Sequence, residues 1–316
     1  MRLVTYLDPA RGSRVAALVG QPSDEGLVDL EDRSDGRLPA DAVALLDLGP
    51  EALVRAADVA ARAGPDIPLA GVQLAAPIPR PPKILAAAAN YQAHITEAGL
   101  PPVDRTRIVP KLFMKPPTSI LAPGKPVHLP EISREVDWEL ELGVVIGRRV
   151  RDVPAERALD VVAGYVTIND VSARTVDWGL PDRQPTNWDS FFDWLNGKWP
   201  DGFCPAGPWL LTADEVPDPQ ALALELRLNG EVRQVGSTAE MLFSVAELVA
   251  FASRFMTLEP GDLIATGTPA GVGVTSRTYL VPGDVMEGRI DGLGVLRTPV
   301  LGPDGTLGPE GPGESG

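Results

Sequence analysis

The chain has 316 residues, of which 44% are hydrophobic and 22% charged, and its formal net charge is −15. This length and composition are typical of a soluble globular protein with a large core, and the negative charge argues against nucleic acid or an anionic membrane as the main partner. No stretch reaches the roughly 18 apolar residues that a membrane span needs, and the N-terminus lacks the apolar core of a signal peptide. The single cysteine, Cys204, cannot form an intrachain disulfide. We therefore expect a cytoplasmic protein.

Residues 1–76 are expected to form a small N-terminal α/β domain. Short strand-like segments precede an Ala- and Leu-rich stretch, 50–63, which predicts a helix. The proline-rich segment 77–82 then interrupts the chain as a linker would. After this linker the pattern is mostly that of strands, so we expect one larger domain over 83–300.

His94 is one of only two histidines in the chain, and Glu97 follows it by three residues. On a helical turn the two side chains share a face and can touch. A carboxylate that hydrogen-bonds an imidazole orients it and raises its basicity, which helps the imidazole to deprotonate a water. The spacing alone also fits an ordinary exposed pair on a helix.

Glu139 and Glu141 lie in the run 136–147, which alternates acidic and apolar residues and then becomes aliphatic. This pattern predicts a strand that enters a buried sheet, and its period of two places both carboxylates on one face. Two buried carboxylates repel each other and need compensation, which a divalent cation can supply. A solvated strand face is the alternative, but the aliphatic continuation of the run favours the metal site.

Asp170 is a third candidate oxygen ligand, because it ends the β-branched run that begins at Tyr165. Three carboxylates without a nearby His or Cys suit Mg²⁺ or Mn²⁺ better than zinc. Three protein ligands also leave coordination positions open for water or substrate. An aspartate at a strand end is, however, also a common turn former.

Lys198 follows a cluster of aromatic residues. An ammonium beside aromatic walls could bind a substrate carboxylate or stabilise a developing oxyanion. The cluster could equally form a lid, a dimer contact or part of the core. Its members are Trp178, Trp188, Phe191, Phe192, Trp194 and Trp199.

Two local signals are strong in the second half of the chain. The segment 222–234 alternates strictly and turns at Asn229 and Gly230, which predicts a β-hairpin. Ser244, with Glu247 three residues later, forms a capping box and predicts that a helix begins there.

A Gly-rich turn over 266–273 follows a strand-like segment and could offer backbone N–H groups to an anion. It lacks the spacing of a P-loop or a dinucleotide fingerprint, so nucleotide binding is not expected. The Gly- and Pro-rich tail over 301–316 is expected to be disordered. Because irregular strands outnumber helices, we expect a mainly β (α+β) fold, a roll or sandwich with decorating helices rather than a doubly wound sheet.

Together these motifs resemble the fumarylacetoacetate hydrolase family, in particular its acylpyruvase and 2-hydroxyhepta-2,4-diene-1,7-dioate isomerase members. The similarity extends from about Lys83 to Leu296. The motifs that carry it are Asn90-Tyr-x-x-His94-x-x-Glu97, Leu112-Phe-Met-Lys115-Pro, Asp137-Trp-Glu-Leu-Glu-Leu-Gly-Val-Val-Ile-Gly147, Gly164-Tyr-x-x-x-x-Asp170-Val-Ser-Ala-Arg174, Gly197-Lys198, Asn229-Gly-Glu-x-x-Gln234 and Leu258-Glu-Pro-Gly-Asp-x-x-x-Thr-Gly-Thr-Pro-x-Gly-Val272.

The resemblance implies a mixed β-sandwich roll of that family's type, usually paired as a homodimer. It implies one Mg²⁺ or Mn²⁺ ion per chain on Glu139, Glu141 and Asp170, in agreement with the ligand argument above.

The resemblance further implies that His94 and Glu97 are the water-activating dyad and that Lys198 is the active-site lysine. Residues that it places near a small keto-acid substrate are Tyr91, Arg174, Gly267 and Thr268.

We therefore expect a catabolic, metal-dependent hydrolase that cleaves a carbon–carbon bond in a 2,4-dioxo acid, an acylpyruvate-like compound. A metal-bound enolate would leave after His94 with Glu97 has prepared a water. The nearest alternative is a lyase or isomerase on the same site: a β-keto acid decarboxylase, a tautomerase or a sugar-acid dehydratase. A non-catalytic binding protein is a further alternative, but the complete set of ligands, dyad and lysine argues against it.

Overall fold

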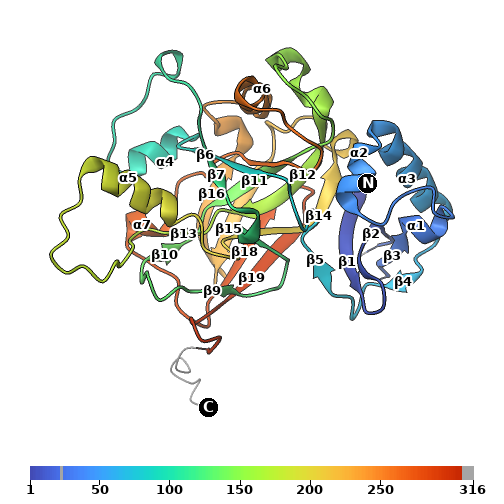
Figure 1. Ribbon diagram of the computed structural model, residues 1–316, viewed down its shortest axis with the longest axis horizontal. Helices are drawn as coiled ribbons and strands as arrows, with labels where there is room; N and C mark the ends of the chain where they lie inside the picture. The colour runs from blue at the N-terminus through green and yellow to red at the C-terminus, as the bar shows by residue number, and fades with distance from the viewer. Residues whose placement is uncertain (22–23, 308–316) are drawn as a thin grey trace.

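Strands form the framework of the protein in a computed structural model that describes residues 1–21 and 24–307 (Figure 1). Within those residues, one sheet has twelve strands, a second has five and a third has two. The predicted mainly β fold with decorating helices is confirmed, and the large sheet mixes parallel and antiparallel pairs. None of the helices in these ranges has the length and apolarity needed to cross a bilayer.

The large sheet contains β1 (Arg2–Asp8), β2 (Gly12–Val19), β3 (Gly26–Asp29), β4 (Ile67–Pro68), β5 (Leu74–Ala75), β6 (Ile84–Ala88), β7 (Lys111–Lys115), β8 (Ile120–Leu121), β11 (Leu140–Ile146), β12 (Val162–Asn169), β14 (Cys204–Thr212) and β17 (Leu263–Ala265). The five-stranded sheet contains β9 (Val127–His128), β15 (Ala223–Leu228), β16 (Glu231–Ser237), β18 (Val285–Ile290) and β19 (Val295–Leu301). The short pair is β10 (Val136–Asp137) and β13 (Ser172–Ala173). The α-helices are α1 (Leu30–Arg33), α2 (Ala42–Asp47), α3 (Pro50–Arg62), α4 (Gln92–Glu97), α5 (Asn187–Asn196), α6 (Val245–Phe255) and α7 (Gly273–Ser276).

The large sheet and the five-stranded sheet pack face to face. Leu140, Leu142 and Val144 of β11 lie in one buried cluster with Leu226 of β15 and Met286 of β18. These three β11 residues share a face because alternate residues of a strand point the same way. The predicted β-sandwich is therefore formed, and its core lies between the two sheets.

The opposite face of the large sheet meets the N-terminal helices. Val145 of β11, Ala265 of β17 and Ala86 of β6 lie in a second buried cluster with Leu45 of α2 and Ala56 of α3. The two predicted glutamate ligands alternate with the sandwich-core leucines of β11, so they belong to this second face. The face is thus shared between a helix-covered region and the candidate site.

Residues 1–21 and 24–76 lie at one end of the large sheet, at the right of Figure 1. Strand β1 pairs antiparallel with β14, with Arg2 opposite Leu211 and Leu3 opposite Leu210. The N-terminal strands therefore continue the same sheet, although they lie far from β14 in the sequence. The division into domains at the 77–82 segment stays a prediction.

Both strong local predictions are confirmed. Asn229 and Gly230 connect β15 to β16 with φ angles of 52° and 82°, as the two central residues of a type I′ hairpin turn require. Ser244 caps α6, and the Glu247 side chain closes the capping box.

The tail predicted to be disordered over 301–316 is ordered where it begins. Leu301 is the last residue of β19, and the Gly302 N–H donates to the Thr306 carbonyl at 2.9 Å in the turn that follows. Leu301 pairs with His128 of β9, and the Gly302–Thr306 bond closes a turn within the tail itself. Residues 308–316 lie outside the described residues.

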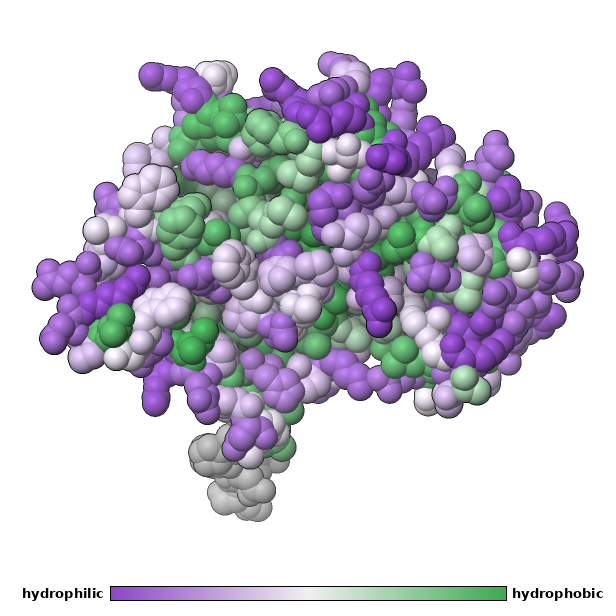
Figure 2. Space-filling view, in the orientation of Figure 1, coloured by the Kyte–Doolittle hydropathy of each residue, from purple (hydrophilic) through white to green (hydrophobic). Residues whose placement is uncertain are grey.

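On the face seen in Figure 2, polar side chains dominate the N-terminal region at the right, whereas apolar side chains gather around α4, β6 and α6. The predicted dyad belongs to α4, in this apolar area.

Candidate active site and metal centre

Three carboxylates meet on the second face of the large sheet. Glu141 lies on β11, Glu139 directly precedes this strand, and Asp170 directly follows β12. β11 and β12 pair antiparallel with Leu140 opposite Asn169, so the start of one strand meets the end of the other. All three carboxylates are at most 6% exposed, and one oxygen from each lies within 4.8 Å of the other two. The predicted ligand set is therefore assembled.

Two buried lysines bond to these carboxylates. Lys198 Nζ donates to Glu139 Oε2 and to Asp170 Oδ2, each at 2.7 Å. Lys115 Nζ donates to the other oxygen of Asp170 at 2.5 Å. Burial by itself would lower the pKa of Lys198, but the negative charges of Asp170 and Glu139 outweigh it and raise that pKa. Both ammonium groups are held by ion pairs that the fold supplies.

Arg174 links a fourth carboxylate, that of Asp137, to the three carboxylates of the candidate metal site. Its Nη2 donates to Glu139 Oε1 at 2.6 Å, and its Nε donates to Asp137 Oδ1 at 2.7 Å. Burial alone would raise the pKa of Glu139, but Lys198 and Arg174 outweigh it and hold that pKa well below its ordinary range. For Asp137 burial prevails over Arg174 and raises the pKa to about 6.

Glu141 differs from the other carboxylates because it makes no ion pair with any described residue. Its hydrogen bond comes from the Gly267 N–H to Oε2 at 2.7 Å. Burial, together with the carboxylates of Asp170 and Glu139, raises the pKa of Glu141 well above its ordinary range. The four buried carboxylates outnumber by one the three cations that pair with this cluster, Lys115, Arg174 and Lys198. A divalent cation would supply the missing positive charge, and oxygen-only donors suit Mg²⁺ or Mn²⁺, so the residues fit the predicted ion.

His94 and Glu97 form the predicted pair on α4. His94 Nδ1 lies 2.8 Å from Glu97 Oε1, and Glu97 Oε2 accepts from the Gly271 N–H at 2.8 Å. An Nδ1–H that donates to the carboxylate leaves Nε2 as an acceptor. His94 lines the same cavity as Glu139 and Glu141. The pair therefore belongs to the site rather than to an ordinary exposed helix face.

The cavity over the carboxylates has a volume of about 240 Å³. Among the residues predicted to contact substrate, Arg174 and Thr268 line it, as does Lys198. Gly267 lies outside this lining, and its N–H is already bonded to a carboxylate of the metal centre. Tyr91 is fully buried outside the lining, and its hydroxyl has no hydrogen-bond partner among the described residues. The substrate contacts of these residues stay predictions.

Lys115 and Asp137 belong to the site, although the sequence analysis named them only as residues of family motifs and gave them no role. Asp137 precedes Glu139 by two residues, so the same alternation could have found it. Lys115 ends an apolar strand and is 1% exposed. A lysine at the buried end of such a strand is a signal in itself, because an ammonium is almost never fully buried without a partner.

The aromatic cluster around Lys198 extends from the cavity to the surface, and four of its six members, Trp188, Phe191, Phe192 and Trp194, lie on α5 at the left of Figure 1. Trp194 lines the cavity and packs edge-to-face on Phe113, with ring centroids 4.9 Å apart. Lys198 Nζ lies 5.4 Å from the Phe113 ring and 5.8 Å from the Trp194 ring. At the other end of the cluster, Trp188 is 73% exposed. One end of the cluster thus belongs to the site, and a lid or homodimer contact stays a prediction for the exposed end.

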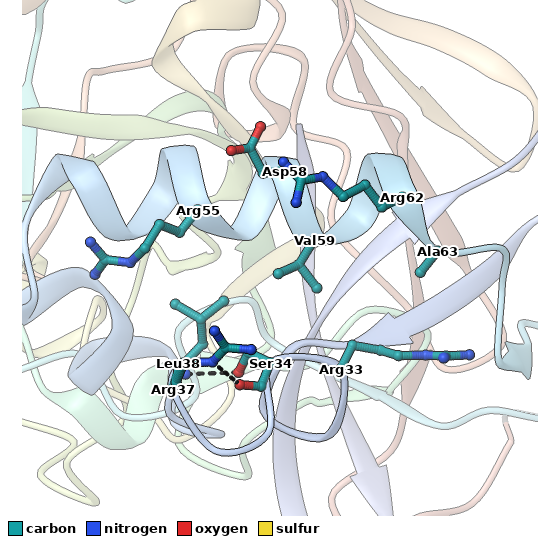
Figure 3. Close-up of a pocket in the computed structure, with 9 residues that line it drawn as sticks. All are labelled: Arg33, Ser34, Arg37, Leu38, Arg55, Asp58, Val59, Arg62 and Ala63. Carbon is teal, nitrogen blue, oxygen red and sulfur yellow. Dashed lines mark hydrogen bonds between the residues drawn. The ribbon is translucent and has the colours of Figure 1, made fainter.

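A larger cavity, of about 400 Å³, lies beside α3 in the N-terminal region (Figure 3). Four arginines line it, but their guanidinium groups point in different directions. Arg33 is bonded to Asp66, and Arg37 Nε donates to the Ser34 carbonyl at 2.7 Å. Asp58 is the only carboxylate in the lining. The smaller cavity is therefore the candidate active site, because the residues suited to acid–base or metal chemistry line it.

The family model described as fumarylacetoacetate (FAA) hydrolase C-terminal matches residues 83–301. This chain belongs to the fumarylacetoacetate hydrolase family. The matched segment contains the three clustered carboxylates, the His94–Glu97 pair and Lys198. Fumarylacetoacetate hydrolase family enzymes are hydrolases, isomerases and tautomerases.

Similar proteins support the family assignment over most of the chain. The chain is 39% identical over 307 residues to the mitochondrial oxaloacetate tautomerase FAHD2A of Bos taurus, covering 95% of this chain and 92% of that protein. It is 46% identical over 222 residues to the 2,4-didehydro-3-deoxy-L-rhamnonate hydrolase of a Sphingomonas species, covering 69% and 73%. The crystal structure of maleylpyruvate hydrolase from Sphingobium sp. SYK-6, in complex with manganese(II) ion and pyruvate, matches 96% of this chain and 99% of that chain, with 32% identity and a TM-score of 0.74. The fold predicted from the family resemblance is confirmed.

Proposed function

We propose that this protein hydrolyses a carbon–carbon bond in a 2,4-dioxo acid, an acylpyruvate-like compound. The observation that carries the proposal is the His94–Glu97 pair, because His94 lines the same cavity as Glu139 and Glu141 while it contacts Glu97. Such a reaction needs a base that takes a proton from water beside a group that polarises the keto acid. The similarity to maleylpyruvate hydrolase and to a dehydro-deoxy-rhamnonate hydrolase supports it.

The charge of the site favours an anionic substrate. Glu139, Glu141 and Asp170 would hold one Mg²⁺ or Mn²⁺ ion, which supplies Lewis-acid polarisation of the keto-acid oxygens when it is bound. The manganese(II) ion in the maleylpyruvate hydrolase structure supports this choice of metal. A divalent ion adds two positive charges, so the net charge of the four carboxylates and three cations would change from one negative to one positive. A carboxylate is then attracted into the cavity despite the negative net charge of the chain.

The side chains of the site have separate tasks in the proposed reaction. Lys198 uses two of its three N–H donors on carboxylates, so one remains for a substrate oxygen. Arg174 likewise keeps N–H donors that bond neither Asp137 nor Glu139. These donors can hold the carboxylate end of the substrate and stabilise negative charge that develops on a carbonyl oxygen.

His94 performs the proton transfer. Its Nε2 takes a proton from a water whose oxygen attacks the C4 carbonyl, while Glu97 holds the tautomer of the imidazole. The C3–C4 bond then breaks, its electron pair moves to C3, and protonation of C3 gives pyruvate. The acyl group leaves with the water oxygen as a carboxylic acid.

The test compares His94→Ala with His128→Ala, since His128 is exposed on β9 and is the only other histidine. Pyruvate release from 2,4-dioxopentanoate, measured with Mn²⁺, should fall by about 10²-fold or more in His94→Ala. It should stay at the parent rate in His128→Ala. Titration with Mn²⁺ should give the same affinity for both variants. If His94→Ala releases pyruvate at the parent rate, the role of the pair as base is wrong.

A tautomerase is the second candidate, because the oxaloacetate tautomerase of Bos taurus covers 95% of this chain. Tautomerisation needs the same keto-acid site but no attacking water. The enol and keto forms of oxaloacetate differ in ultraviolet absorbance, so their interconversion can be followed without product release. A parent enzyme that interconverts them and releases no pyruvate from any 2,4-dioxo acid would favour this candidate.

A further inference from the structure

Arg174 is held along one edge of its guanidinium group. Its Nε donates to Asp137 Oδ1 at 2.7 Å, and its Nη2 donates to Glu139 Oε1 at 2.6 Å. These two bonds use two of the five N–H donors of the planar group. Two of the other donors point in parallel from the neighbouring edge, a geometry that binds a carboxylate through two hydrogen bonds. Because Arg174 lines the active-site cavity, this second edge is available to a ligand.

A second buried arginine, Arg14, is paired in a different way. All three of its guanidinium nitrogens donate to carboxylates, those of Asp29, Glu31 and Asp32. In Arg174, by contrast, Nη1 makes no hydrogen bond with any described residue. The fold therefore surrounds Arg14 with acceptors, whereas it holds Arg174 by one edge and leaves the other edge free.

Asp137 is itself fixed by its backbone, by a hydrogen bond and by packing. It lies in β10, where it pairs with Ser172 of β13. Its carboxylate is fully buried, and Oδ2 accepts from the Val274 N–H at 2.7 Å. Gly273 packs so closely that a Cβ at position 273 would lie 2.6 Å from the Asp137 Cβ. The Asp137 side chain therefore has little freedom to turn, and the direction of its Oδ1 sets the plane of the Arg174 guanidinium.

We infer that Asp137 is a positioning residue, which fixes the guanidinium plane of Arg174 so that the free edge faces the carboxylate of the keto acid. The inference rests on the proposed function, because it takes a 2-oxo acid as the ligand. Glu139 alone would hold Arg174 by a single bond, around which the guanidinium can rotate. Ligand binding would then have to immobilise the group, which weakens affinity. Asp137 orders the group before the ligand arrives.

The test measures the binding of 2-oxopentanoate, which lacks the 4-oxo group of 2,4-dioxopentanoate and cannot be cleaved. This probe is titrated calorimetrically into protein saturated with Mn²⁺, after the Mn²⁺ affinity of each variant has been measured. Asp137→Asn offers one oxygen to two donors, so its hold on Arg174 weakens in either orientation of the amide. We expect its Kd for the probe to rise about fivefold. Asp29→Asn is the matched control, because it changes a buried partner of Arg14 outside the cavity and should leave the Kd unchanged.

A double-mutant cycle separates this role from a merely structural one. In an Arg174→Gln background, which lacks the guanidinium, Asp137→Asn should change the Kd no further. Arg174→Lys keeps the charge but has no planar fork for two carboxylates, so it should weaken binding at least as much as Asp137→Asn does. This variant tests the inference even where Asp137→Asn does not fold.

Two results would overturn the inference: an equal effect of Asp137→Asn in both backgrounds, or a Kd like that of the parent in Asp137→Asn or Arg174→Lys. The proposed function is judged separately by pyruvate release. If the parent binds 2-oxopentanoate with the expected dependence on Asp137 but hydrolyses no dioxo acid, the proposed function fails and the inference holds.

Discussion

Replacing Glu141 by Gln should change the stability of the metal-free and the metal-loaded protein in opposite directions. Glu141 is buried beside Glu139 and Asp170 and makes no ion pair among the described residues. At 4.8 Å and an effective dielectric constant near 20, each pair of unit charges repels by about 3.5 kcal/mol. Lys198 bonds to both neighbours and cancels part of this repulsion. Gln keeps the acceptor for the Gly267 N–H and removes the charge.

The stability that Glu141→Gln gains in the metal-free protein has an upper bound. A buried carboxyl can avoid the repulsion by protonation, which costs about 3.7 kcal/mol at pH 7 for a group with an unfolded pKa near 4.3. We therefore expect the free energy of unfolding to rise by about 2 kcal/mol in Glu141→Gln at pH 7. The raised pKa of Glu141 gives the sign of the pH dependence. The parent loses stability as pH rises above 4.3, so the advantage of the variant should shrink as pH falls toward 4.3.

Bound metal should reverse the order of stability, so that the parent becomes more stable than Glu141→Gln. At a Mn²⁺ concentration one hundred times its Kd, the parent gains about 2.7 kcal/mol, or about 4 °C in Tm for 316 residues. The variant lacks one of three ligands and should gain much less. Urea unfolding of chelator-treated protein between pH 4.5 and 8, and thermal unfolding with and without Mn²⁺, measure both effects. Glu131→Gln, at an exposed position, is the control. A metal-free Glu141→Gln protein less stable than the parent at pH 7 would refute the reasoning.

Three further predictions concern stability. Lys115→Met should lower the free energy of unfolding of the metal-free protein by about 3–5 kcal/mol in urea, because it leaves the buried Asp170 short of a partner. Burial alone would raise the pKa of Asp29, but its bonds to Arg14 outweigh burial and lower it. The stability that this lowered pKa provides is present above about pH 4 and is lost as pH falls further, so Asp29→Asn should flatten the acid limb of a stability–pH curve. Gly164→Ala on β12 should cost about 2–3 kcal/mol in urea unfolding, because its Cβ would meet a backbone oxygen of β14 at 2.1 Å.

Each of these predictions has a result that contradicts it. A Lys115→Met protein as stable as the parent would mean that the Asp170 charge is compensated elsewhere. An unchanged slope below pH 4 in Asp29→Asn would show that this carboxyl titrates alike in both states. Gly64→Ala is the control for Gly164→Ala, because a Cβ at position 64 would have open space around it. Gly305→Ala would not serve, because the φ angle of Gly305 is positive. Equal losses for Gly64→Ala and Gly164→Ala would rule out the close approach of β12 and β14.

Features that depend on local patterns could be predicted from the sequence. The alternation over 136–146 places Glu139 and Glu141 on one face whatever the rest of the fold does, because the side-chain period of a strand is two. The hairpin at Asn229 and Gly230 and the capping box at Ser244 are likewise short-range. His94 and Glu97 needed only one helical turn to meet. The order of the motifs added the family, which agreed with the metal that the three carboxylates had already predicted.

Features that depend on strand order and register were decided by the tertiary structure alone. Lys115 and Lys198 reach Asp170 from β7 and from the end of α5, segments separated by more than 80 residues of chain. The Gly267 N–H bonds to Glu141 from the loop after β17, and Arg174 bonds to Glu139 from the segment after β13. No sequence period encodes these neighbours, because a strand's own pattern sets its faces but not which strand lies beside it. Long-range pairing therefore determined the charge balance of the site.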